Sequence, residues 1–316
     1  MGKYIVTGGA GFIGSHLAKK LVSLGHEVLI LDDLSTGRKE NLPEKTDFIQ
    51  IDLSRQEEID KIPSQNYTGV LHLAAQSSGE ISFEDPYKDY LINSGSTLLL
   101  LDWCLKNKVN RFFYSSSMSI YGGDDNPCKQ EDSPCHPNSF YGISKLASEN
   151  YIRLFGKMGI NYTIFRLFNV YGPGQNIQNL KQGMVSIYLA YILQNNPILV
   201  KGSWERFRDL TYIDDVIEAW IMTIDDPKTF GKTYNLATGK KTTVRELLNL
   251  LLENYGLDRS YPIVNSSGTP GDVFGYTADI NSIQSDIAWN PRYGIKKGLK
   301  MMTDYYRKEP NPKGKP

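Results

Sequence analysis

Short apolar runs alternate with longer amphipathic runs through the first half of this 316-residue chain. The short runs predict strands at residues 3–7, 27–31, 46–51, 69–73, 111–115 and 162–166, and the longer runs predict helices at 13–24, about 94–107 and 144–158. Strands that alternate with helical crossovers lie parallel in one sheet. The pattern therefore predicts an α/β fold built on a doubly wound parallel sheet.

The pattern loosens after the Gly-Pro-Gly run at residues 172–174. Helices are expected at 184–193, 213–224 and 244–255, and short strands at 198–201 and 233–236. We expect a large domain over residues 1–172, to which elements from about 205–238 return, and a smaller mixed α/β domain over 173–316. The last residues, from about 308 onward, carry three Pro and three Lys and are expected to form a disordered tail.

Composition narrows the class of protein. Lys plus Arg equals Asp plus Glu at 35 each, which gives no electrostatic reason to expect nucleic acid or an anionic membrane as partner. No secretory signal precedes the first strand, and no apolar run approaches the roughly 20 residues of a membrane helix. Three cysteines are too few for a disulfide framework, and Cys128 and Cys135 with His136 make a poor zinc site. We expect a soluble cytoplasmic protein without a bound metal.

A glycine-rich turn follows the first predicted strand and opens the first helix. The run Thr-Gly-Gly-Ala-Gly-Phe-Ile-Gly at residues 7–14 places Gly8, Gly11 and Gly14 around this turn, with Phe12 and Ile13 at the start of the helix. Glycines allow a tight turn and close approach of a pyrophosphate, and the helix N-terminus offers free N–H groups. The context predicts a dinucleotide site.

Two acidic residues end the second predicted strand. Asp32, or alternatively Asp33, can accept hydrogen bonds from the adenosine ribose and would repel a 2′-phosphate, which favours NAD over NADP. The alternative is that both only cap the turn that follows at 35–37. Arg38 follows closely and could instead accommodate NADP. Asp52 and Leu53, after the third strand, suit the adenine ring.

The chain contains two Tyr-x-x-x-Lys pairs, Tyr141/Lys145 and Tyr293/Lys297. This spacing stacks a phenol and an ammonium on one helical face. Only Tyr141 follows a parallel strand that ends in serines, at residues 115–117, where doubly wound folds bind their ligands. Lys145 and a bound oxidised nicotinamide could together lower the pKa of Tyr141 from about 10 toward neutrality, so that it acts as a base.

These motifs resemble the UDP-galactose 4-epimerase group of the extended short-chain dehydrogenases/reductases, which have a Rossmann-like fold. The resemblance rests on the glycine turn, Asp32, the Ser-Ser-Ser-Met-Ser-Ile-Tyr-Gly segment at 115–122 and Tyr141/Lys145, and it continues through Leu73, Ala74 and Ala75, Asn93, residues 166–172, Arg208-Asp209 and Gly271-Asp272. It thus spans nearly the whole chain.

The resemblance implies a role for each matching residue. Tyr141 would be the base, Lys145 would hold the nicotinamide ribose, and Ser117 would bind the reacting sugar hydroxyl. Leu73, Ala74, Ala75 and Asn93 would lie in the cofactor site, and Ser119, Asn169, Lys201, Arg208 and Tyr276 in the substrate site. Asn169 and Arg208 would contact the diphosphate of a nucleoside-diphosphate sugar, although a surface salt bridge is the alternative for Arg208.

The residues after Ser117 separate the chemistries of this group. Dehydratases of the group carry an Asp-Glu pair there and decarboxylases keep the Glu, whereas this chain has Met118 and Ser119, which cannot act as acid or base. We therefore expect inversion at C4 through a 4-keto intermediate, with NAD regenerated in each turnover. The alternatives are a sugar-nucleotide reductase, a 2-epimerase, and a dinucleotide-sensing binding protein without turnover.

Departures from the group's pattern bear on the substrate. Thr269 replaces an Arg that would contact phosphate, and Lys201 stands where an aromatic residue often lies beside the base. Tyr276 occupies a position where bulk tends to exclude N-acetylated sugars, so a UDP-hexose or UDP-hexuronic acid is expected. The predicted helices at 97–105 and 146–155 carry more apolar residues than one buried face requires, which predicts a homodimer, with burial under the C-terminal half as the alternative.

Overall fold

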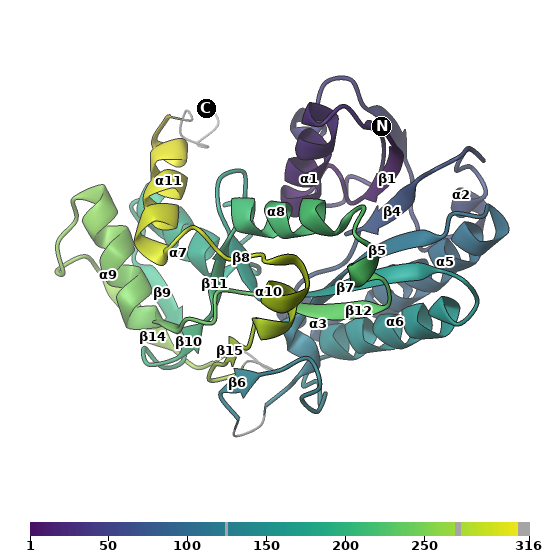
Figure 1. Cartoon of the computed structure of the whole chain (residues 1–316). Coiled ribbons are helices and arrows are strands. Elements are labelled where there is room, and N and C mark those ends of the chain that lie inside the picture. Colours follow the sequence, from purple (N-terminus) through teal and green to yellow (C-terminus); the bar gives the residue numbers. More distant parts are fainter. Residues whose placement is uncertain (124–125, 269–272, 309–316) are drawn as a thin grey trace.

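The computed structural model describes residues 1–123, 126–268 and 273–308, and its centre is a seven-stranded parallel sheet (Figure 1). Its strands are β1 (Lys3–Thr7), β2 (Glu27–Asp32), β3 (Asp47–Gln50), β4 (Gly69–His72), β5 (Arg111–Ser117), β7 (Asn161–Leu167) and β12 (Lys232–Leu236). Their order across the sheet is β12-β7-β5-β4-β1-β2-β3. The predicted doubly wound sheet is confirmed, and β12 joins it from the second half of the chain.

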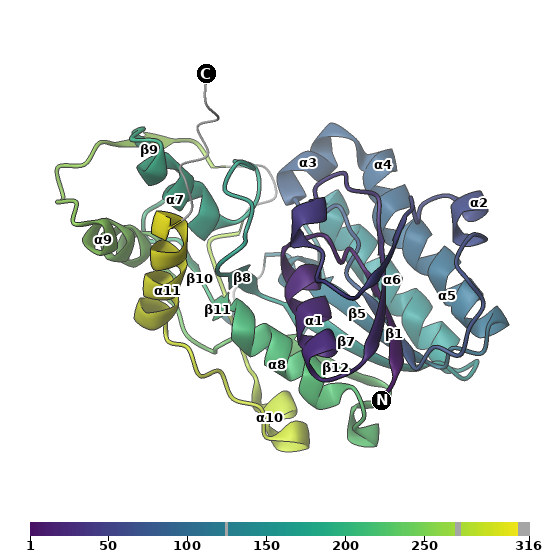
Figure 2. The same ribbon diagram turned by 90° about the horizontal axis from the view of Figure 1, so that it is seen from above.

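Helices cover both faces of this sheet (Figure 2). On one face lie α1 (Phe12–Ser23) and α8 (Ile213–Thr223), and on the other α5 (Ser96–Lys106) and α6 (Phe140–Gly156). Successive strand residues alternate between these faces, because side chains of a strand point to opposite sides. In β1, for example, Tyr4 and Val6 pack on the first face and Ile5 on the second.

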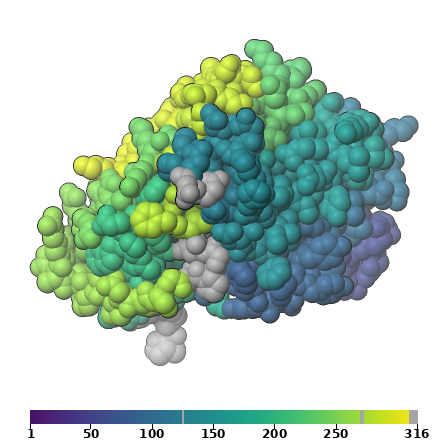
Figure 3. All heavy atoms as spheres, turned by 90° about the horizontal axis from the view of Figure 1, so that it is seen from below, coloured from purple at the N-terminus to yellow at the C-terminus, as the bar shows by residue number. Residues whose placement is uncertain are grey.

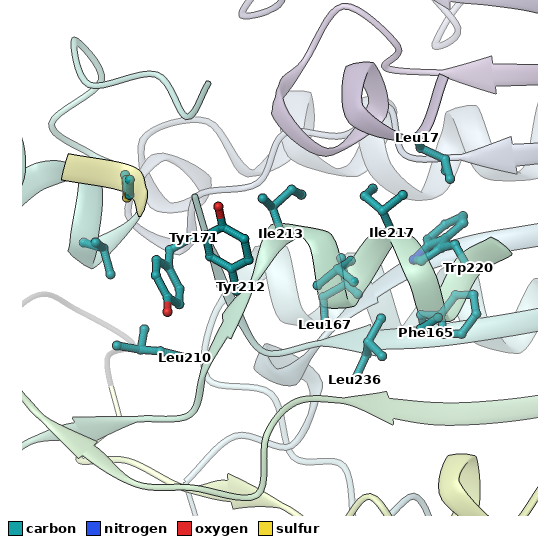
Figure 4. Close-up of a cluster of buried hydrophobic side chains, with 14 of the residues drawn as sticks. Leu17, Phe165, Leu167, Tyr171, Leu210, Tyr212, Ile213, Ile217, Trp220 and Leu236 are labelled. Atoms are coloured by element: carbon teal, nitrogen blue, oxygen red, sulfur yellow. The ribbon is translucent and has the colours of Figure 1, made fainter. Parts of the chain in front are cut away.

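The first face forms the larger apolar core. Figure 4 shows Leu17 of α1 facing Ile217 and Trp220 of α8, with Phe165 of β7 packed beneath. The rings of Phe165 and Trp220 lie 4.8 Å apart, and Trp220 is fully buried. This core continues without interruption into the second half of the chain. Helix α8, which belongs to that half, packs in the same core as α1 and β7.

Besides α8 and β12, the described part of the second half carries short strands and three longer helices. The strands pair as β8 (Asn169–Tyr171) with β11 (Leu210–Tyr212), β9 (Ile198–Lys201) with β14 (Ile263–Ser266), β10 (Phe207–Arg208) with β13 (Thr242–Thr243), and β15 (Thr277–Ala278) with β6 (Cys128–Lys129). The helices are α7 (Met184–Leu193), α9 (Val244–Tyr255) and α11 (Ile295–Lys308), with the short α10 (Asn281–Ile287) before the last. In Figure 1, α7, α9 and α11 lie to the left of the sheet.

Several short elements connect the first-half strands. These are α2 (Gln56–Ile59), α3 (Gly79–Glu84), α4 (Pro86–Tyr90), a π-helical turn at Leu91–Gly95, and 3₁₀ turns at Lys39–Asn41, Met118–Ile120 and Pro227–Thr229. The π turn replaces the first residues of the helix expected from about 94, so that α5 begins at Ser96. No helix in the described part of the chain is both long and apolar enough to cross a bilayer.

The start of α6 corrects the sequence prediction. The helix expected at 144–158 begins instead at Phe140, one turn earlier, because Ser139 accepts a hydrogen bond from the backbone N–H of Gly142 and caps it. Tyr141 therefore lies inside the first turn of the helix that also carries Lys145. The expected tail from about 308, apart from Lys308 itself, and the motif residues Thr269, Gly271 and Asp272 lie outside the described residues.

Candidate active site

A cavity of about 1080 Å³ lies at the carboxyl ends of the parallel strands. The glycine turn and the residues after β2, β3, β4 and β5 line one part of it, and residues of α7, β8, β9 and β10 line the other. In doubly wound folds ligands bind at this edge of the sheet. The cavity thus joins the predicted cofactor residues to the second half of the chain.

The glycine turn leaves no room for side chains. A Cβ on Gly14 would lie 2.1 Å from the carbonyl oxygen of Gly8, and one on Gly8, whose φ is +66°, would lie 2.8 Å from the amide nitrogen of Ala74. No side chain caps the N-terminus of α1 at Gly11, which lines the cavity. Backbone N–H groups and the positive end of the helix are thus available to a pyrophosphate, so this part of the chain fits NAD.

Asp32, the last residue of β2, and Asp33, the next residue, both line the cavity but differ in their surroundings. Asp32 is buried and accepts hydrogen bonds from the backbone N–H groups of Ala10 (3.0 Å) and Leu34 (2.8 Å). Asp33 is exposed and accepts from the N–H and hydroxyl of Ser35. Both therefore shape the turn, and Asp32 also presents a fixed carboxylate to the cavity.

Most of the other expected cofactor residues also line the cavity, namely Phe12, Ile13, Asp52, Leu53, Leu73, Ala74, Ala75 and Lys145. Two do not. The guanidinium of Arg38 donates to the side chain of Gln178 at 2.7 Å, so it reaches toward the segment between β8 and α7. Asn93 lies in the π turn and donates to Asp89 at 3.0 Å. A cofactor role for these two residues remains a prediction.

Tyr141 and Lys145 lie together in the cavity wall. The ammonium of Lys145 donates to the carbonyl oxygen of Ser115 at 2.8 Å and lies 5.8 Å from the centre of the Tyr141 ring. Tyr293, of the second Tyr-x-x-x-Lys pair, does not line this cavity and stacks instead on Tyr212. The structure therefore places Tyr141, and not Tyr293, beside the predicted cofactor residues.

Burial sets the pKa values of this pair. It raises the pKa of Tyr141 to about 12, and a hydrogen bond with Ser117 opposes that rise. It lowers the pKa of Lys145 to about 7, against the charges of Asp89 and Glu149. The expected lowering of the Tyr141 pKa is thus not produced by the chain's own groups. It requires a positive charge such as that of oxidised nicotinamide.

The end of β5 carries the residues expected to face the sugar. Ser117 accepts a hydrogen bond from the N–H of Ser119 at 3.2 Å, and both line the cavity with Met118. The buried hydroxyl of Ser119 and the side-chain oxygen of Asn169 in β8 have no hydrogen-bond partner among the described residues. Buried polar atoms without partners are costly, so these two atoms point to a polar ligand in the cavity.

Buried cationic side chains also line the cavity. Arg206 and Arg208 are both buried and both line it, and the charge of Arg206 adds to burial in lowering the pKa of Arg208 to about 10. The alternative of a surface salt bridge for Arg208 is wrong, since the residue is only 5% exposed. Lys201 of β9 forms an ion pair with Glu80 of α3 at 3.2 Å. Two buried arginines that line one cavity are a candidate site for an anion.

Tyr276 lines the cavity beside the residues that follow Ser117. It is 3% exposed, donates a hydrogen bond to the carbonyl oxygen of Met118 at 3.0 Å and packs against the rings of Tyr121 and Phe168. The ring is thus held firmly beside the residues that follow Ser117. A rigid aromatic side chain therefore bounds the cavity next to the residues expected to face the sugar.

Arg206 and Asp89 are among the cavity residues that the sequence pattern did not predict. Arg206 lies two residues before Arg208, and the period of an extended chain could have placed both on one face. Asp89 is a buried carboxylate next to the Tyr141/Lys145 pair, and its sequence surroundings resemble an exposed helix, so no local signal could have found it.

Comparisons with known proteins agree with this geometry. The model of the NAD dependent epimerase/dehydratase family matches residues 4–237. A putative UDP-glucose 4-epimerase of Methanocaldococcus jannaschii is 33% identical, over 96% of this chain and 98% of its own. The structure of UDP-glucose 4-epimerase with UDP-glucose from Thermotoga maritima is 34% identical with a TM-score of 0.92, covering 97% of this chain and 99% of that one. The Thermus thermophilus UDP-glucose 4-epimerase complex with NAD is 31% identical with a TM-score of 0.90, at the same coverage.

Proposed function

Because the chain belongs to the NAD dependent epimerase/dehydratase family, we propose that it inverts C4 of a UDP-hexose or UDP-hexuronic acid. The observation that carries this proposal is the cavity itself. Ser117, Tyr141 and Lys145 line the same cavity as the glycine turn and the buried Arg206/Arg208 pair. A sugar placed at the serine and tyrosine would extend its diphosphate toward the arginines.

The first half of the cavity would hold NAD. The uncapped N-terminus of α1 would bind the pyrophosphate, Asp32 the adenosine ribose, and Lys145 the nicotinamide ribose. Asp52 and Leu53 would lie against the adenine. When bound, NAD supplies the hydride acceptor for oxidation at C4 and the hydride donor for the return step.

Tyr141 would carry the proton of the reaction. Its phenolate removes the proton from the C4 hydroxyl as that carbon is oxidised, and its phenol returns the proton after the ring has turned over in the cavity. Lys145, whose ammonium lies 5.8 Å from the centre of the Tyr141 ring, would add its charge to that of the oxidised nicotinamide in stabilising the phenolate, and Ser117 would hold the reacting oxygen. The buried arginines hold the diphosphate in place while the oxidised sugar rotates and presents its other face for the return step.

The residues after Ser117 favour epimerisation over elimination. Met118 and Ser119 line the cavity where a carboxylate acid and base would be needed to remove water. Tyr276, fixed against Met118, supports a substrate without an N-acetyl group. A plain hexose or uronic acid is therefore the proposed sugar, and uridine the proposed base.

Proton NMR of the purified protein with NAD tests the function. UDP-glucose and, separately, UDP-glucuronic acid are incubated with the protein, and the anomeric region is followed. A new anomeric signal of the corresponding galacto sugar is expected for one or both. Unchanged spectra with both would overturn the proposed substrate class, and release of a reduced product on addition of NADH would indicate a reductase.

We also propose a homodimer formed by α5 and α6. These helices contact each other and, with α3 and α4, carry large apolar side chains that are at least 36% exposed. The exposed residues are Phe83, Tyr87, Tyr90, Leu98, Phe140, Ile143 and Leu154. The surface of this part of the chain is drawn in blue to teal in Figure 3. Exposed apolar surface of this extent is typical of an interface. Size-exclusion chromatography with light scattering should give twice the 35.7 kDa of one chain.

We also propose a cytoplasmic location and a division of the chain into two domains. All three cysteines are free, which suits the reducing cytoplasm. Residues 1–172, with β11, α8 and β12, would form the NAD-binding domain, and the remainder the sugar-nucleotide domain. Limited proteolysis with and without a UDP-sugar would test this division.

A further inference from the structure

Asp89 is a buried carboxylate in the wall of the proposed active site. It lies in α4, is 1% exposed and lines the cavity. Its Oδ1 accepts hydrogen bonds from Gln76 Nε2 (2.8 Å) and Asn93 Nδ2 (3.0 Å), and its Oδ2 accepts one from the hydroxyl of Ser144 (2.7 Å). Ser144 stands between Tyr141 and Lys145 on α6, so Asp89 holds the turn that carries both.

Only neutral groups hold this carboxylate. Among the described residues, no Lys, Arg or His forms an ion pair with Asp89 within 4.0 Å. Glu149, the other buried carboxylate near Lys145, differs because Arg166 and Arg153 both pair with it. A buried charge without a cationic partner acts strongly on nearby ionisable groups. The charge of Asp89 therefore reaches Tyr141 and Lys145 with little compensation.

Lys145 is a buried ammonium with few partners of its own. Its Nζ donates to the carbonyl oxygen of Ser115 and lies 4.8 Å from the centre of the Tyr114 ring. The titratable groups that face it are Asp89 from α4, Tyr141 and Glu149 from α6, Tyr114 from β5 and His72 from β4. Burial lowers the pKa of His72 to about 3, so that residue is neutral. Among the described titratable residues that face Lys145, Asp89 is thus the negative charge that no cationic side chain compensates.

We propose that Asp89 is a positioning residue: its carboxylate fixes the first turns of α6 and supplies the negative charge that keeps Lys145 an ammonium beside Tyr141. The inference rests on the proposed function, since it assumes that Tyr141 and Lys145 work as base and ammonium. Catalysis then also requires an anion near Lys145, because a lysine this deeply buried loses its proton readily without one.

The sign of the effect follows from the charge. Burial lowers the pKa of Lys145 to about 7 and the charge of Asp89 opposes this; burial raises the pKa of Tyr141 and Asp89 adds to that rise. Loss of the negative charge therefore lowers both pKa values. Tyr141 becomes a phenolate at lower pH, and Lys145 becomes neutral at lower pH. The pH profile of turnover should therefore move to lower pH on both its acidic and its basic side.

The test compares Asp89→Asn with the unchanged protein. Ultraviolet titration of the tyrosinate of Tyr141, with Tyr141→Phe in each background as the blank, is carried out with and without NAD. The midpoint should fall by roughly one pH unit. The pH profile of turnover should move in the same direction by a similar amount. If the wild type turns over no UDP-sugar, the proposed function fails, but the titration still decides the role of Asp89.

Two further variants separate charge from packing. Ser144→Ala removes a hydrogen bond from Asp89 without removing its charge, and should leave the tyrosinate midpoint unchanged. Gln76→Lys places a cation beside Asp89 and should shift the midpoint as Asp89→Asn does, which keeps the test available if Asp89→Asn does not fold. An unchanged midpoint in either folded charge variant would overturn the proposal.

Discussion

Glu149 and Arg166 form a fork-to-fork ion pair in the interior of the protein. Arg166 Nε donates to Glu149 Oε1 at 3.0 Å, and its Nη2 donates to Oε2 at 2.9 Å. The same carboxylate accepts from the hydroxyl of Ser116 at 2.6 Å and from Arg153 at 2.7 Å. Glu149 lies on α6, Arg166 on β7 and Ser116 on β5. The pair therefore fixes the helix of Tyr141 against the strand that ends in Ser117.

Glu149→Gln should destabilise the protein strongly. The side chain is completely buried, and the amide would leave the Arg166 guanidinium without its counter-charge. Removing one partner of a buried pair costs about 3–5 kcal/mol. Urea unfolding followed by circular dichroism measures the loss. Arg153→Gln serves as the control, because that partner is one third exposed, and its removal should cost less than about 1 kcal/mol.

The same pair predicts a stability that depends on pH. Burial alone would raise the pKa of Glu149, but Arg166 overcomes this and lowers it below its usual value. A carboxylate whose folded pKa is lowered contributes stability above its unfolded pKa of about 4.5, and loses it as pH falls through the folded value. Wild type should therefore lose more stability than Glu149→Gln on acidification below about pH 4.5. Equal losses would contradict the paired state of Glu149.

Tyr141→Phe should remove turnover and leave the cofactor in place. The phenyl ring fills the same space, so folding and NAD binding should persist, while the proton acceptor is lost. General base catalysis contributes roughly 100- to 10,000-fold, and the loss should fall in this range or above it. Turnover by NMR and NAD binding by quenching of tryptophan fluorescence measure the two effects. A variant that kept full activity would show that another group is the base.

The two buried arginines predict that contacts to the diphosphate supply much of the affinity for the substrate. Arg206→Gln and Arg208→Gln should each weaken the binding of UDP by roughly tenfold or more, since each removes a charge-assisted hydrogen bond to phosphate. Isothermal titration compares UDP with uridine, which lacks the diphosphate. Uridine affinity should change little in either variant. A parallel loss for uridine would place these arginines at the base and not at the phosphates.

The sequence predicted well those features that depend on local pattern. The strand at residues 3–7 and the helices at 184–193 and 244–255 have the predicted bounds, because their apolar periodicity and flanking turns are strong. The glycine turn and the Tyr141/Lys145 pair lie in the cavity because their strand and helix contexts were correct. The start of α6 was placed one turn late, because its cap, Ser139, follows a Pro-rich loop with no periodic pattern.

Contacts between distant segments could not be read from the sequence. Asp89 lies in a run of charged and aromatic residues typical of a solvent face, and only the packing of α4 against α6 buries it. Arg38 has the spacing of a nucleotide ligand, yet it contacts Gln178, which is 140 positions away along the chain. The partners of Glu149 likewise lie on β5 and β7, so its burial depended on a sheet order that no local signal reveals.

Asp32→Asn should weaken NAD binding and reduce the preference for NAD over NADP. The Asp32 carboxylate is held by the N–H groups of Ala10 and Leu34, and this geometry would present it to the adenosine ribose. Replacing a charged acceptor costs about 1.5–3 kcal/mol, so the Kd for NAD should rise roughly 10- to 100-fold. NADP should lose less, because the carboxylate no longer repels its 2′-phosphate. Fluorescence titration with both cofactors measures the two changes.

Asp33→Asn is the matched control, because Asp33 also lines the cavity but is exposed and bonded to Ser35. Its NAD affinity should stay within about threefold of wild type, as expected for a surface substitution. Burial raises the pKa of Asp32, so in wild type the ionised form is lost at a higher pH than for an exposed aspartate. NAD affinity should therefore fall as pH is lowered in wild type and in Asp33→Asn, and less in Asp32→Asn. A larger effect from Asp33→Asn would assign the ribose contact to the second aspartate, and would leave Asp32 as a residue that only shapes the turn.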